Sequence, residues 1–70
     1  MTYVNVVLNG KDTTIDSRTT IHQVVVDTAG TENGVAVAVD GNLLRKPRWD
    51  ITLEQLSPRT IDILSAVQGG

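Results

Sequence analysis

The residues best placed to carry chemistry in this chain are Gly69 and Gly70, which follow the apolar, strand-like run 61–67 after Gln68. Glycine has no Cβ, so this stem adopts almost any backbone conformation and passes through a channel too narrow for side chains. A carboxylate at Gly70 is ionised at neutral pH and is a poor electrophile, so it reacts only after activation. We therefore expect the Gly70 carboxylate to be delivered into another protein's active site, although a frayed chain end has the same composition.

Length and composition exclude several other classes of function. Seventy residues make one domain with a small core, so we expect no enclosed catalytic cleft and no enzyme activity. The sequence has no cysteine, which excludes disulfides, thiolate nucleophiles and cysteine metal sites. Six basic and eight acidic residues give a net charge of −2, which does not favour nucleic acid as a partner. Without a signal peptide or a membrane span in the sequence, we expect a soluble, cytoplasmic protein with no membrane partner.

The first half of the chain predicts a hairpin followed by a helix. Strands are expected over 3–8 and 11–16, because Asn9 and Gly10 between them both tolerate positive φ. A helix is expected to follow. A capping box formed by Thr20 and Gln23 predicts where this helix begins, and Gly30 predicts where it ends. Between them, residues at helical spacing form one apolar stripe, which comprises Ile21, Val24, Val25 and Ala29.

The second half predicts two short strands, one helical turn and a last strand. Large and small apolar residues alternate over 35–39, and the turn pair Asp40-Gly41 leads to a short strand at Leu43 and Leu44. Leu53 and Leu56 have the spacing of one helical turn, and the last strand is expected over 61–67. One helix and four to five strands predict an α+β domain of two layers over 1–67, with 68–70 as a flexible tail.

Alternation along the strands separates a buried face of the sheet from an open one. The predicted core comprises Val4, Val6, Leu8, Ile15, Ile21, Val24, Val25, Val35, Val37, Val39, Leu43, Leu56, Ile61 and Ile63. On the opposite face we expect a flat, mildly apolar patch with no helix over it, formed by Val7, Ala36, Ala38, Leu64 and Ala66. Such a surface beside a reactive chain end is typical of a docking platform, although scattered exposed apolar residues are also ordinary.

These residues resemble the ubiquitin-like β-grasp sulfur carriers, and within them the carrier proteins of thiamine (thiazole) biosynthesis. The similarity extends over the whole chain. It rests on Asn9-Gly10, on 19–21, on the block 34–41, on Arg48-Trp49 and above all on the ending Ala-Val-Gln-Gly-Gly over 66–70. The molybdopterin-type sulfur carriers have the same fold and Gly-Gly ending but resemble this ending less. The chain departs from the family at 57–60, where Ser-Pro-Arg-Thr replaces a Gly-Asp turn.

The resemblance implies a β-grasp fold, with one helix packed across one face of a mixed sheet, and a mechanism in which partners do the catalysis. An E1-like adenylating enzyme would use Mg-ATP to convert the Gly70 carboxylate into an acyl-adenylate. A sulfur-relay protein of the cysteine desulfurase or rhodanese type would then supply the sulfur of a thiocarboxylate, which thiazole synthase consumes. Gly69, Gln68 and Val67 would occupy the partner's channel, and the carrier itself would bind no cofactor.

Besides the thiamine-type carrier, three alternatives remain open from the sequence. They are a molybdopterin-type sulfur carrier, a ubiquitin-like interaction module whose Gly70 is never activated, and a modifier joined through Gly70 to lysines of other proteins. Further residues have unremarkable interpretations. His22, the one histidine, is expected on the helix surface without a converging partner, and Trp49 is expected to cover an edge of the core. The basic residues over 45–48 are expected in a solvated loop.

Overall fold

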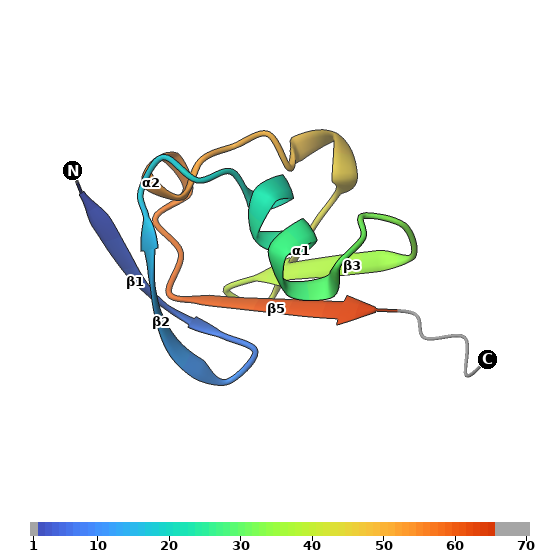
Figure 1. The fold of residues 1–70 in the computed structure, drawn as a ribbon, viewed down its shortest axis with the longest axis horizontal. Helices are drawn as coiled ribbons and strands as arrows, with labels where there is room; N and C mark the ends of the chain where they lie inside the picture. Colours follow the sequence, from blue (N-terminus) through green and yellow to red (C-terminus); the bar gives the residue numbers. More distant parts are fainter. Residues whose placement is uncertain (1, 66–70) are drawn as a thin grey trace.

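The fold is given by a computed structural model that describes residues 2–65 (Figure 1). In chain order the elements are β1 (Tyr3–Leu8), β2 (Lys11–Asp16), α1 (Ile21–Ala29), β3 (Val35–Val39), β4 (Asn42–Leu44), the 3₁₀ turn η1 (Lys46–Arg48), α2 (Leu53–Leu56) and β5 (Thr60–Ser65). The strands form one sheet in the order β2-β1-β5-β3-β4. Only β1 and β5 are parallel among these neighbours. The predicted α+β class is confirmed, as a β-grasp-like mixed sheet with α1 packed across it.

Both predicted hairpin turns are present, and both use a left-handed backbone. Asn9 and Gly10 have φ of 50° and 84°, and Asp40 and Gly41 have φ of 51° and 85°. Turns of this kind match the right-handed twist of the strands that they join. They fix the register, so that Leu8 lies opposite Lys11 in the first hairpin.

Helix α1 begins and ends where the sequence predicts. Thr20 Oγ1 accepts a hydrogen bond of 3.2 Å from the Gln23 amide, and Gly30 ends the helix with φ of 79°. The second half of the predicted capping box is wrong, because the Gln23 side chain donates to Asp27 instead. A complete capping box occurs at α2. No helix within residues 2–65 has the length and apolar character needed to cross a membrane.

The helices and the turn η1 all lie on one side of the sheet, and the core fills the space between (Figure 1). Its buried apolar residues are Val6, Ile21, Val24, Val25, Val37, Val39, Trp49, Leu53, Ile61 and Ile63. Five predicted core residues are only partly buried at its margin, namely Val4, Leu8, Ile15, Val35 and Leu56. The core therefore centres on α1 and the middle strands, where α1 contacts β3 and β5.

One core prediction is wrong and two core residues were not predicted. Leu43 is 67% exposed, because it pairs with Ala38 and so lies on the open face, whereas Leu44 pairs with Val37 on the core side. The two core residues missing from the predicted core are Trp49, which the sequence analysis expected only to cover its edge, and Leu53. Their burial shows that the irregular segment between β4 and β5 closes the end of the core.

Candidate functional site

The open face of the sheet carries four of the five residues predicted to form a docking patch. Strand β3 pairs with β5 so that Ala36 lies opposite Leu64 and Ala38 lies opposite Asp62. Ala36 is exposed, Ala38 is half-buried, and Leu64 is 63% exposed. Val7 lies on the same face, opposite Thr60 in the neighbouring parallel pair. The fifth residue, Ala66, lies outside the described residues.

Leu43 extends this surface on the β4 side, because it lies beside Ala38. We call Ala36, Ala38, Leu43 and Leu64 the open-face patch. Its two leucines are the exposed large apolar side chains on this part of the sheet. The exposed Asp62 lies on the same face, two positions from both Thr60 and Leu64, and so separates Val7 from Leu64. The apolar surface is therefore concentrated over β3, β4 and the last part of β5.

A hollow of about 450 Å³ lies where β5 ends and β3 begins. Its lining includes Val35, Ala36, Leu64 and Ser65, together with the loop before β3. Ser65 is the last described residue, so this hollow borders the point from which the chain continues to Gly70. The predicted tail residues Val67, Gln68, Gly69 and Gly70 lie outside the described residues. Their roles stay predictions.

The turn residue Asn9 attaches the first hairpin to β5. Its N–H donates to the Ile61 carbonyl at 2.9 Å, and its side-chain Oδ1 accepts from the Ile63 N–H at 2.7 Å. In a continuing parallel pair, the backbone carbonyl of residue 9 would accept the Ile63 N–H. Because the chain turns back at Asn9, the side-chain carbonyl takes that place. Asn9 thus holds β5 immediately before Leu64.

Asp40 performs the same function for the second hairpin. Its Oδ1 accepts from the N–H groups of Arg59 and Thr60, at 2.8 and 2.9 Å, and its own N–H donates to the Thr60 carbonyl. The backbone hydrogen bond from Thr60, followed by the one from Arg59, lowers the pKa of the Asp40 carboxyl below its ordinary value of 3.8. The two turns therefore hold β5 at both its start and its middle.

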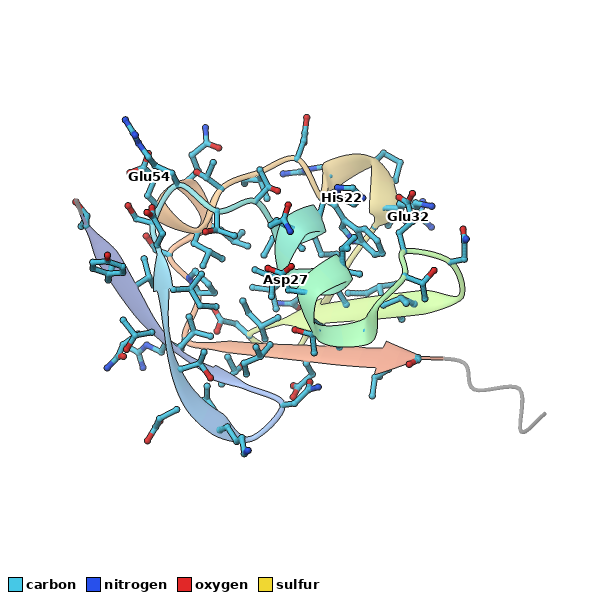
Figure 2. The ribbon with its side chains drawn as sticks, in the orientation of Figure 1. His22, Asp27, Glu32 and Glu54 are labelled. Carbon is cyan, nitrogen blue, oxygen red and sulfur yellow. The ribbon has the colours of Figure 1, made fainter. Side chains whose placement is uncertain are left out.

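His22 has a carboxylate partner, contrary to the expectation of an unpartnered surface histidine. Its Nε2 lies 3.0 Å from Glu32 Oε1, and Lys46 Nζ lies 3.6 Å from the same oxygen. Figure 2 shows the His22 and Glu32 side chains facing each other above α1. The hydrogen bond with His22, together with the charge of Lys46, lowers the pKa of Glu32. All three groups are about half exposed. The cluster connects α1, the loop before β3 and η1, and it lines an open hollow of about 380 Å³.

Trp49 is a core residue, which confirms the sequence interpretation. It is 3% exposed, its Nε1–H donates to the Leu44 carbonyl at 2.9 Å, and its ring stacks near His22 with centroids 6.5 Å apart. The basic residues Arg45, Lys46 and Arg48 are exposed, as predicted for this segment. Because Trp49 points inward, it is not an anchor on the molecular surface.

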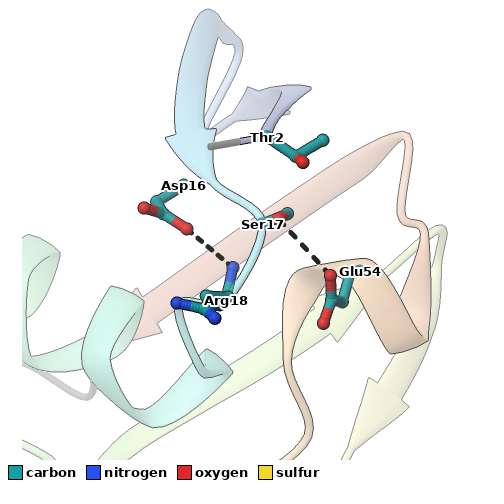
Figure 3. A pocket seen from close by; sticks show the side chains of 5 residues that line it. All are labelled: Thr2, Asp16, Ser17, Arg18 and Glu54. Carbon is teal, nitrogen blue, oxygen red and sulfur yellow. Dashed lines mark hydrogen bonds between the residues drawn. The ribbon is translucent and has the colours of Figure 1, made fainter.

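The polar hollow between the end of β2 and α2 is a structural junction (Figure 3). Ser17 is buried there, and its hydroxyl donates to Glu54 Oε1 at 3.5 Å. The Ser17 carbonyl accepts a hydrogen bond from the Glu54 N–H, and the Ser17 N–H donates one to the Thr2 carbonyl, both at 2.9 Å. Asp16 Oδ1 accepts from the Arg18 N–H at 2.9 Å. These contacts account for the polar groups by connecting β1, β2 and α2.

Within residues 2–65 no three acidic or histidine side chains converge as metal ligands do. Comparisons with protein-family models, curated proteins and solved structures gave no significant match. The family resemblance of the sequence therefore stays a prediction. The features that any functional assignment must use are the open-face patch, the hollow at the end of β5 and the residues that follow Ser65.

Proposed function

We propose that this protein is a sulfur carrier of the thiamine type, whose Gly70 carboxylate is adenylated and then converted to a thiocarboxylate. The observation that carries the proposal is the position of the open-face patch. Leu64 of this patch directly precedes Ser65, on the strand that leads to Gly70. A partner that docks on the patch is thereby held close to the reactive end of the chain.

Chain length limits how that partner is built. Gly70 is the fifth residue after Ser65, and five extended residues span at most about 18 Å. The adenylating site must therefore lie within that distance of Ser65 when the enzyme covers Leu64. The absence of a side chain at Gly69 and Gly70 suits a narrow entry channel. An E1-like adenylating enzyme, the partner that the sequence resemblance implies, would have to meet both requirements.

The chemistry needs no catalytic group from this chain. A carboxylate oxygen of Gly70 would attack the α-phosphorus of Mg-ATP and release pyrophosphate. Sulfide would then attack the acyl carbon and displace AMP, which leaves the thiocarboxylate for thiazole synthase. In the cell, the proposed donor is the cysteine persulfide of a sulfur-relay protein of the cysteine desulfurase or rhodanese type. Its terminal sulfur would displace AMP to form an acyl disulfide, and a second thiol would reduce that disulfide to release the thiocarboxylate. Because the sequence has no cysteine, no other group of the chain competes as a carrier of transferable sulfur.

Intact-mass measurement tests the proposal directly. The full chain is incubated with Mg-ATP, the adenylating enzyme of the same organism and sulfide, and then with a thiol-alkylating reagent. The expected product gains the mass of one oxygen replaced by one sulfur, becomes alkylated and carries the label on the C-terminal peptide. A chain that ends at Gly69 tests the dependence on Gly70. The mass of the untreated protein from its native host shows whether Gly70 is its carboxyl end.

A second candidate is an interaction module, because the exposed Leu43 and Leu64 would bind a partner without any activation of Gly70. Deletion of Gly70 distinguishes the two functions. A sulfur carrier would keep its fold and lose thiocarboxylate formation, whereas an interaction module would keep its whole activity. If the active adenylating enzyme produces neither adenylate nor thiocarboxylate, the sulfur-carrier proposal is wrong.

A further inference from the structure

The two edges of the sheet differ in a way that the proposed function does not explain. The β4 edge is three residues long and continues directly into the segment that carries η1, whose Trp49 donates to the Leu44 carbonyl. The β2 edge runs for six residues, Lys11–Asp16, and no described strand lies beyond it. Proteins either block edge strands of this length against pairing or use them to bind another chain, because their outward backbone groups can form hydrogen bonds with an added strand.

The hairpin register shows which backbone groups of β2 face outward. Lys11 pairs with Leu8 across a two-residue turn, so this pair is hydrogen-bonded to β1, and alternate residues along β2 follow it. The hydrogen bond from the Ser17 N–H to the Thr2 carbonyl continues this alternation, in which the odd-numbered residues of β2 bond to β1. Asp12 and Thr14 therefore point their N–H and C=O groups away from β1. They offer an added strand two donors and two acceptors.

A groove of about 260 Å³ lies beside this edge, between β2 and α1. Its lining includes Leu8, Thr13, Ile15, Val24, Asp27 and Thr28. The odd-numbered residues of β2 lie on this side of the sheet, because Thr13 and Ile15 pair with Val6 and Val4 of the core side. Alternate side chains of an added strand would therefore enter the groove beside Thr13 and Ile15. Its aliphatic lining favours valine or isoleucine there.

Charges on the open-face side of the same edge select the partner. Asp12 and Asp16 lie four positions apart on that side, and Asp27 lies at the groove. Two copies of β2 pairing antiparallel about Thr14 would place Asp12 of one copy opposite Asp16 of the other, which is repulsive. Lys11 and Arg18 are the positive groups near the two ends of this edge. The edge therefore disfavours a second copy and favours a strand with basic residues opposite Asp12 and Asp16.

We propose that the β2 edge and its groove bind an extended segment of another protein with the pattern basic-aliphatic-polar-aliphatic-basic, added antiparallel as a sixth strand. The polar residue lies opposite Thr14, the aliphatic residues lie opposite Thr13 and Ile15, and the basic residues lie opposite Asp12 and Asp16. This is main-chain pairing with pockets for alternate side chains, a general mode of peptide recognition. It lies across the sheet from β3 and β4, so it is compatible with a second partner on the open-face patch.

The test is a nuclear magnetic resonance titration of the full chain with the capped peptide Gly-Arg-Val-Thr-Val-Arg-Gly. We expect saturable shifts centred on the amides of Asp12 and Thr14 and on the methyl groups of Ile15 and Val24. A peptide with glutamate in place of both arginines should bind at least about tenfold more weakly, since two attractive pairs become repulsive. N-methylation of the central threonine should also weaken binding at least about tenfold, because it removes the donor to the Thr14 carbonyl.

Matched variants of the protein separate backbone pairing from side-chain effects. Thr14→Pro removes the outward N–H and should abolish binding, whereas Thr14→Val keeps that N–H and should bind like the parent protein. Both lose the Thr14 hydroxyl bond to Asn5 Oδ1, so that loss cancels in the comparison. Asp12→Lys should shift the preference towards the glutamate peptide. If Thr14→Pro does not fold, the N-methylated peptide tests the other hydrogen bond of the same backbone pair, the one that the Thr14 carbonyl accepts.

Several results would overturn the proposal. They are the absence of saturable binding by the arginine peptide at millimolar concentration, equal binding of the glutamate peptide, shifts confined to the open-face patch, and self-association through β2 in sedimentation experiments. The titration needs neither adenylation nor sulfur. Failure of this proposal and failure of the sulfur-carrier function are therefore distinguishable.

Discussion

Replacement of Asn9 should weaken the attachment of β5 and so lower the stability of the whole domain. Asn9 has two separable roles, because it adopts a left-handed φ of 50° and accepts the Ile63 N–H at 2.7 Å. Asn9→Gly keeps the backbone conformation and removes only the acceptor. Asn9→Ala removes the acceptor and also places a Cβ in the left-handed region. A comparison of the two variants therefore measures each role.

The structure sets the expected magnitudes. The Ile63 N–H is partly buried, and a donor left without a partner in such a place costs about 1–3 kcal/mol, which is our expectation for Asn9→Gly. A left-handed alanine adds about 1 kcal/mol or more, so Asn9→Ala should lose about 2–4 kcal/mol. Since a domain of this size is stable by only about 3–5 kcal/mol, Asn9→Ala should be close to unfolding at room temperature. Each kcal/mol should lower Tm by about 4–8 °C.

Urea unfolding followed by Trp49 fluorescence is a suitable assay, because Trp49 is the one tryptophan of the chain and is buried. Hydrogen exchange of the Ile63 amide adds a local measurement. Asn9→Asp is the control, since its carboxylate still accepts and aspartate tolerates the left-handed turn; it should stay close to the parent protein at neutral pH. An unchanged midpoint and unchanged Ile63 exchange in Asn9→Gly would refute the reasoning. Equal losses in the glycine and alanine variants would refute the left-handed contribution.

Three further predictions concern the open face, the core and pH. Leu43→Ser and Leu64→Ser should change stability by no more than about 0.5 kcal/mol, because both side chains are largely exposed, yet each should lower kcat/KM of the adenylating enzyme by about fivefold or more. Trp49→Phe should cost about 1 kcal/mol in urea unfolding, because it leaves the Leu44 carbonyl without the indole donor while keeping most of the packing. Asp40 has a lowered folded-state pKa, so its stabilising contribution is present above its unfolded value of 3.8 and is lost as pH falls through the folded value; Asp40→Asn should therefore show a shallower loss of Tm in acid.

Each of these predictions has an outcome that contradicts it. Normal adenylation of the leucine variants would exclude the open-face patch as the docking surface, with Arg48→Ala on the helix side as the control for general surface changes. A Trp49→Phe protein as stable as its parent would show that the indole hydrogen bond contributes nothing net. Identical acid profiles of Asp40→Asn and the parent would mean that the charge of Asp40 does not stabilise the fold. The pKa of Glu32 is lowered like that of Asp40, so Glu32 would also contribute to the acid profile. Glu32 is therefore replaced by glutamine in both proteins of that comparison.

Much of the fold follows from short-range sequence rules. The pairs Asn9-Gly10 and Asp40-Gly41 predict both hairpins, because few residues other than these adopt the left-handed backbone of such turns. The start of α1 at Thr20 is equally local, since the cap satisfies a helical N–H only three residues away. Alternation along β3 and β5 places Ala36, Ala38 and Leu64 on the open face correctly.

The errors occur where the deciding neighbour is distant in the chain. The sequence analysis assigned Leu43 to the wrong face because the short strand β4 shows no alternation of apolar and polar residues. Its orientation is fixed by pairing with β3, in which Leu43 lies opposite Ala38 and Leu44 lies opposite Val37. The partner of His22 is Glu32, which lies in the loop before β3, rather than the nearer Asp27, because that loop returns over α1. Gln23 bonds to Asp27 in place of the predicted capping contact.

The sequence by itself determined the strands, the helix, the turns and the apolar faces of the longer strands, since each depends on the conformation of residues within one turn or one hairpin. A one-helix, two-layer sheet allows the first and last strands to lie side by side in its middle, but the tertiary structure decided the full order, in which β5 lies between β1 and β3. That insertion brings Asn9 and Asp40 onto β5, places Leu64 beside Ala36 and leaves β2 as the long free edge. Strand order depends on which distant surfaces bury each other best, and no local pattern records that choice.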